Sequence, residues 1–169
     1  MVNSVQAYCQ WLGDTPLSMT IKTVGWLIPT VQTIHILSIS VVMAAAAVVD
    51  LQVLGVLPRR EPLAAVAQRF LPWIWWSVIV LLISGSTLII AEPNRSLPNP
   101  AFVLKMSMLT AVLIFTLAFQ QGLRRDARFW EKSPAHRIGG QILALFSLAF
   151  WVGIVFAGRW IAYIDLDAA

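Results

Sequence analysis

Four long apolar runs, separated by short polar segments, form the main pattern along this chain. A helix rises about 1.5 Å per residue, so each run is long enough to cross a hydrocarbon core of about 30 Å. The connections between consecutive runs are short, which favours antiparallel neighbours. We therefore predict an all-α fold, a transmembrane four-helix bundle with up-down-up-down topology, in which residues 1–169 form a single integral membrane domain. The predicted spans are residues 26–49, 73–91, 101–121 and 138–163.

Shorter patterns predict helices that lie on the membrane surface. In residues 3–12, NSVQAYCQWL, apolar side chains recur three and four residues apart, and a second short segment covers residues 17–25. Both segments suit short N-terminal helices at the outer interface. In the first loop, Pro62 is followed by LAAVAQRF, ahead of the span that begins at Trp73. This predicts a separate small amphipathic helix on the inner surface.

Composition supports a membrane protein, and the distribution of charge predicts its orientation. Hydrophobic residues make up 59% and charged residues 12% of the chain, whereas soluble proteins carry about 25% charged residues. Most basic residues lie in the two loops that must share one side of the membrane, and the positive-inside rule makes that side cytoplasmic. Both termini are then outside. The net charge of +4 reflects this orientation and contact with the lipid bilayer, so no nucleic-acid partner is expected. The basic loop residues are Arg59, Arg60, Arg69, Arg124, Arg125, Arg128, Lys132 and Arg137.

His35 is the one ionisable residue that the pattern places near the middle of the bilayer. Titratable side chains are costly at that depth and usually mark function. On a helix His35 shares a face with Gln32 and Asp50, so this face must look into the bundle or at a partner. Three interpretations remain open: a hydrogen bond to a neighbouring helix, an axial bond to the iron of haem b, or a proton or quinone site. The hydrogen-bond candidates are Gln32, Ser84, Ser86 and Thr87.

If haem b binds, His35 is the predicted ligand of its iron. The other histidine, His136, lies about 20 Å away along the membrane normal, so the two cannot hold one iron. What remains is a methionine ligand from Met106 or Met108, a five-coordinate iron, or a histidine from a second subunit.

Basic residues near the outer ends of spans three and four form a further group of candidates. Lys105 and Arg159 either neutralise haem propionates or extend to the lipid headgroups, with Glu92 as a local partner. Asp50 is expected to pair with an arginine of the inner loops. No c-type haem motif, phosphate-binding glycine loop or catalytic signature is present, so the pattern does not indicate an enzyme that acts on its own.

Four segments of the chain carry a family resemblance: WLGDTPLSMTIKTVGWLIPTVQTIH at 11–35, VVDLQVLGVLPR at 48–59, NPAFVLKMSML at 99–109 and AGRWIAY at 157–163. They resemble a group of small bacterial four-span inner-membrane proteins of undefined function. That group is more distantly similar to four-helix b-type cytochromes and copper-resistance membrane domains. The resemblance implies a bacterial inner (cytoplasmic) membrane location with periplasmic termini. The matching positions are Trp26, Pro29, His35, Asp50, Lys105, Gly158, Arg159 and Tyr163.

One departure from the group concerns the end of the third span. Related chains often have a Phe-His pair there, whereas this chain has Phe119–Gln120. A histidine that acts as a ligand elsewhere in the group would therefore be missing here.

These observations lead to one main expectation and two alternatives. We expect a membrane subunit or partner of a respiratory or redox complex, taking part in electron transfer and binding one haem b through His35. The first alternative is a cofactor-free accessory subunit that packs against other membrane subunits or forms a homo-oligomer. The second is a small transporter or a quinone-site protein, although four spans without an inverted repeat do not favour transport.

Overall fold

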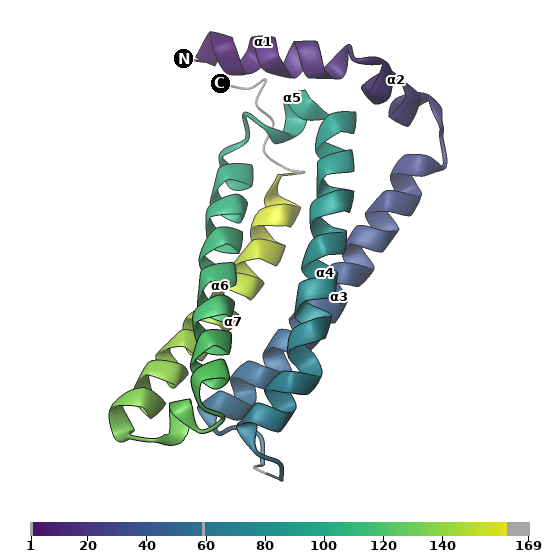
Figure 1. The fold of residues 1–169 in the computed structure, drawn as a ribbon. Coiled ribbons are helices and arrows are strands. Elements are labelled where there is room, and N and C mark those ends of the chain that lie inside the picture. Colours follow the sequence, from purple (N-terminus) through teal and green to yellow (C-terminus); the bar gives the residue numbers. More distant parts are fainter. Residues whose placement is uncertain (1, 59, 162–169) are drawn as a thin grey trace.

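The computed structural model describes residues 2–58 and 60–161, and its core is a bundle of four long helices. Each of the four is apolar and long enough to cross a membrane. They run alternately up and down (Figure 1), which confirms the predicted all-α, four-helix membrane bundle. The helices are α3 (Leu27–Leu54), α4 (Leu63–Ala91), α6 (Pro100–Arg125) and α7 (Pro134–Trp160). Two predicted positions, Arg59 and Tyr163, lie outside the described residues.

The prediction of a separate small helix in the first loop is wrong. The segment LAAVAQRF is the first part of α4 and continues without a break through Pro72 into the second span. The reason is packing: Leu63, Ala67 and Leu71 lie on one face of α4 and are buried in the same core as the residues that follow. A continuous buried face outweighs the breaking tendency of one exposed proline.

Short helices cover one end of the bundle, which we call the terminal end. As predicted, the N-terminal segment forms two of them, α1 (Val2–Gly13) and α2 (Pro16–Thr23). Helix α1 lies across the ends of the long helices, close to α5 (Pro93–Ser96) (Figure 1). The Ser18 hydroxyl donates to the carbonyl oxygen of Ile90 at 2.8 Å, which ties α2 to α4.

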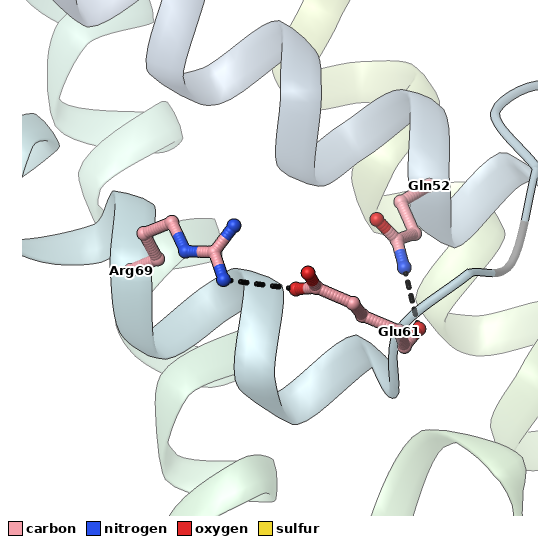
Figure 2. A network of polar contacts seen from close by, with 3 residues as sticks. All are labelled: Gln52, Glu61 and Arg69. Atoms are coloured by element: carbon pink, nitrogen blue, oxygen red, sulfur yellow. Dashed lines mark hydrogen bonds and ion pairs between the residues drawn. The ribbon is translucent and has the colours of Figure 1, made fainter.

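The opposite end of the bundle, which we call the basic end, carries both remaining connections. Helix α3 stops at Gly55, whose φ of 79° is the left-handed conformation that favours glycine. A polar network then holds the connection to α4 (Figure 2). The Gln52 side-chain amide donates to the carbonyl oxygen of Glu61 at 3.1 Å, and Arg69 donates to the Glu61 carboxylate at 3.0 Å.

Trp130 packs the second connection, between α6 and α7, against the basic end of the bundle. It lies in the short 3-10 helix η1 (Phe129–Glu131) between α6 and α7. Its indole N–H donates to the carbonyl oxygen of Phe119 at 3.1 Å, and its ring stacks on the Phe119 ring. Gly122 on α6 and Gly140 on α7 leave the space that this ring fills.

Packing in the bundle is uneven along its length. Helix α3 packs mainly against α4 and α7, and α6 packs mainly against α7, whereas α4 and α6 make few direct contacts. Every buried residue of α3 lies between Val42 and Val53, towards the basic end. We call the half of the bundle next to the basic end the basic half, and the half next to the terminal end the terminal half. The terminal half is the more loosely packed of the two.

Candidate functional site

A cavity of about 270 Å³ lies in the terminal half, with walls from all four long helices. Its residues are mostly apolar, with a few polar groups among them. This composition is typical of a site for a small molecule or cofactor, and its volume is close to the lower end of the usual range of roughly 300–1,000 Å³. The cavity brings together four predicted positions, His35, Lys105, Met106 and Gly158, with Gly85 and Ser86 of α4.

The His35 ring is held in one orientation by α4. Its Nδ1 atom lies 2.7 Å from Oγ of Ser84, so the predicted hydrogen bond to a neighbouring helix is confirmed with one of the four candidates. The Ser84 hydroxyl donates its single hydrogen to the carbonyl oxygen of Val80 at 2.6 Å. The ring tautomer with a hydrogen on Nδ1 satisfies both short contacts, because Ser84 then accepts from His35 while it donates to Val80. In the neutral ring, Nε2 then carries a lone pair that can bind a metal or accept a hydrogen bond.

Gly85 packs beside this ring. A Cβ atom added at Gly85 would lie 3.4 Å from Cε1 of His35, the ring carbon between the two nitrogens. Ser84 and Gly85 are thus the two residues of α4 that meet the ring, one through a hydrogen bond and the other through close packing. The hydrogen bond to Ser84 holds the imidazole against α4.

Lys105 reaches the same cavity from α6. The Lys105 side chain packs over Gly158 of α7. A Cβ atom added at Gly158 would lie 3.7 Å from the Lys105 ammonium nitrogen. Within the described part of the chain, this ammonium group forms no hydrogen bond or ion pair. A cationic donor and a neutral acceptor therefore line one largely apolar cavity.

The remaining predicted site residues separate into different places. Met106 lines the cavity, but the sulfur of Met108 packs beside Gly153 of α7, where an added Cβ would be 2.8 Å away. Arg159 is exposed near the end of α7 and is not among the cavity residues. Glu92 pairs with Arg95 at 3.1 Å.

Gln120 takes the place of the histidine in the Phe-His pair of related chains, and its side chain forms a hydrogen bond within the bundle. Its side-chain oxygen accepts a hydrogen bond from the indole of Trp75 on α4 at 3.2 Å. Gln120 does not line the His35 cavity, so a histidine at this position would serve a different part of the bundle. The departure therefore removes no group from the cavity.

Sequence reasoning missed Trp151 and misjudged Asp50. Trp151 lines the cavity, is 2% exposed, and its indole N–H has no acceptor among the described residues. The prediction that Asp50 pairs with an arginine is wrong for the described chain, because the residue is buried in the basic half beside Ser147. Only the helix packing reveals either environment. One sequence signal for Trp151 was its position two helical turns before Gly158, on the same face of an otherwise apolar span.

Comparison with curated proteins gives no match, and comparison with solved structures also gives none. The similarity to b-type cytochromes and copper-resistance domains therefore stays a prediction. A family match does cover nearly the whole chain, from residue 8 to residue 164. The chain belongs to DUF6644, a family of unknown function.

Proposed function

We propose that this protein is a membrane subunit or partner of a redox complex and binds one haem b in the terminal-half cavity, with His35 as an axial ligand. One observation carries the proposal: the bare Nε2 side of His35 and the cationic Lys105 line the same apolar cavity. Histidine ligands of metals typically donate their other ring N–H to a fixed acceptor, as His35 does to Ser84.

The placement of Lys105 fits the acidic edge of a haem. Lys105 lies about 7 Å along α6 from the start of that helix, and His35 about 12 Å along α3, so the ammonium group is nearer the terminal end. Propionates directed towards that end would meet it in a charge-assisted hydrogen bond. Met106 is the methionine that lines the cavity, and we propose it as the second ligand.

A bound haem b would supply reversible one-electron transfer. The chain's own residues would bind and orient it: His35 would be held by its hydrogen bond to Ser84, and the apolar walls of the cavity would exclude water. One-electron transfer needs a redox partner, so we propose that the protein would act as one component of a larger assembly.

We further propose an inner-membrane location with the basic end in the cytoplasm and both termini in the periplasm. The support is that the basic residues of both connections lie at the same end of the bundle, as the positive-inside rule expects of a cytoplasmic side. They are Arg60 and Arg69 near the first connection and Arg124, Arg125 and Arg137 near the second. Reporter domains fused to the C-terminus test this: a periplasm-active reporter should work and a cytoplasm-active one should not.

An absorption spectrum tests the haem proposal. The protein extracted in mild detergent, from cells supplied with haem, should show a reduced-minus-oxidised spectrum with the bands of haem b. His35→Ala should abolish these bands. His136→Ala is the matched control and should leave them unchanged, because His136 hydrogen-bonds to Ser133 at the basic end. Absence of the bands in the unmodified protein, or their survival in His35→Ala, would overturn the proposal.

A quinone is the second candidate, favoured by one specific observation. Leu82 of α4 and Met106 of α6 line the cavity and are exposed, so the cavity reaches the lipid-facing surface between these helices. Lys105 would donate to a quinone carbonyl and His35 would accept from a quinol hydroxyl. A quinone co-extracted with a colourless protein, and lost in Lys105→Met, would favour this candidate over haem.

A further inference from the structure

A buried carboxyl group lies in the basic half, far along α3 from His35. Asp50 is 8% exposed and is the one charged side chain among the buried residues of the described chain. Its Oδ2 atom is inaccessible and has no hydrogen-bond partner within that part. A bare carboxylate oxygen in such a place is strongly destabilising, so this atom needs a proton or a hydrogen-bonding partner.

The space beside Asp50 fits one small occupant. A cavity of about 20 Å³ is lined by Asp50, Thr116 and Ser147 together with apolar side chains. One water molecule needs about 10–15 Å³ of such space and at least two polar partners. The Thr116 hydroxyl donates to the carbonyl oxygen of Val112 at 2.9 Å, which leaves its lone pairs able to accept from that water.

The walls of this cavity carry no competing charge. Helix α4 contributes Leu71 and Ile74, α6 contributes two phenylalanines and Thr116, and α7 contributes Leu143, Ala144 and Ser147. No titratable or charged side chain other than Asp50 is among these lining residues. Cations that bind to oxygen, such as Ca²⁺ or Mg²⁺, take about six or more ligands, and this lining offers only one carboxyl group and two hydroxyls.

We propose that Asp50 is a proton-binding site. It exchanges protons with the aqueous phase at the basic end of the bundle, through one water molecule held between its carboxyl group and Thr116. In the uptake step a hydronium ion loses a proton to Oδ2: an O–H bond breaks on the hydronium, an O–H bond forms on the carboxyl group, and water remains. Asp50 lies about 6 Å from the end of α3 at the basic end, so it is much nearer to this side of the membrane than to the other. The site does not depend on the cavity around His35.

Labelling with an apolar carbodiimide tests the proposal, because this reagent modifies protonated carboxyl groups in apolar surroundings. The full chain in proteoliposomes should be labelled at Asp50, as mapped by mass spectrometry. Labelling should fall as pH rises, by about tenfold per pH unit above the half-titration point. Asp50→Asn should lose this label, whereas Glu61→Gln, which changes an exposed acid paired with Arg69, should retain it.

The unmodified protein provides the decisive series, so the test stands even if Asp50→Asn fails to assemble. At constant pH, exchanging Na⁺ for K⁺ or for a large organic cation should not change the labelling. Protection by one of these cations would overturn the proposal in favour of a metal-ion site. Absence of label at Asp50 throughout the pH series, or labelling independent of pH, would also overturn it.

Discussion

The basic and terminal halves of the bundle are built from the same four helices but packed in opposite ways. In the basic half, small and branched side chains such as Ala45, Ala46 and Val49 let α3 approach its neighbours closely, and Trp130 closes the end. In the terminal half α3 has no buried residue before Val42, and the space between the helices is a cavity of about 270 Å³.

This difference separates stability from function along one set of helices. Close packing is the main source of helix association in lipid, because lipid tails are as apolar as the side chains. The basic half provides that packing, which lets the terminal half keep an open, largely apolar cavity with a few polar groups. Substitutions should therefore change stability in the basic half and ligand binding in the terminal half.

The largest expected effect on stability comes from removing the Phe119 side chain in the basic half. Phe119 is 8% exposed and stacks on Trp130 with ring centroids 5.6 Å apart. Phe119→Ala should lower the free energy of unfolding by about 3 kcal/mol, measured by denaturant titration in detergent micelles. Phe102, which lines the cavity, is the matched control, and Phe102→Ala should cost clearly less. Equal losses at both positions would break the distinction between the halves.

Adding one methyl group at Gly122 should have the next largest effect. Its Cβ would lie 2.7 Å from Nε1 of Trp130 and 2.8 Å from the Phe129 ring, so the rings must move and the bond to Phe119 weakens. Gly122→Ala should destabilise the protein by about 1–3 kcal/mol. Gly139→Ala, where the nearest Trp130 atom would be 3.8 Å away, should be close to neutral in the same denaturant titration. A neutral Gly122→Ala would contradict the proposed role of Trp130 in packing the second connection.

In the terminal half, Ser84→Ala should change ligand binding more than stability. The variant removes the acceptor that fixes the Nδ1–H tautomer of His35. If haem binds as proposed, its affinity should fall by about 10–100-fold, measured by titration of the haem-free protein. Thr87→Ala is a control, because its hydroxyl donates to the Ile83 carbonyl on the exposed side of α4. Unchanged affinity in Ser84→Ala would show that this hydrogen bond does not position the ring.

The smallest expected effect concerns the exposed turn after α6. Hydrogen bonds from Lys132, at 2.6 Å, and from the Arg128 backbone N–H, at 2.8 Å, lower the pKa of Asp126. A carboxyl group whose folded-state pKa is lowered stabilises the fold above its unfolded-state pKa, and this contribution is lost as pH falls through the folded-state value. Proteolysis of this turn should therefore increase at acidic pH. Asp126→Asn should remove this pH dependence, and an unchanged profile would contradict it.

Most of the bundle could be predicted from the sequence because lipid imposes a simple rule. Every backbone polar group must be paired within the membrane, so a long apolar run can only be a helix. The same rule gave a wrong prediction for residues 63–70. Polar residues there and Pro72 suggested that the second span begins only at Trp73. The buried face of Leu63, Ala67 and Leu71 holds this segment in α4, and such packing depends on a neighbouring helix that periodicity alone does not reveal.

The candidate site could be predicted in part. His35 and Lys105 were identified by chemistry, since polar groups deep in an apolar span need partners. Their meeting in one cavity depends on helix rotation, which also places Met106 at the cavity and Met108 against Gly153. The surroundings of Trp151 and Asp50 are set by three neighbouring helices, so no spacing within one helix could predict them.

Nitrogen NMR of the His35 ring tests most directly the claim that this imidazole presents a bare Nε2 to the cavity. The chain has two histidines, and His136→Gln leaves His35 alone in haem-free protein labelled with ¹⁵N-histidine in lipid bilayers. We predict a neutral ring with hydrogen on Nδ1 and none on Nε2. A hydrogen on Nε2, with Nδ1 bare, would contradict the account.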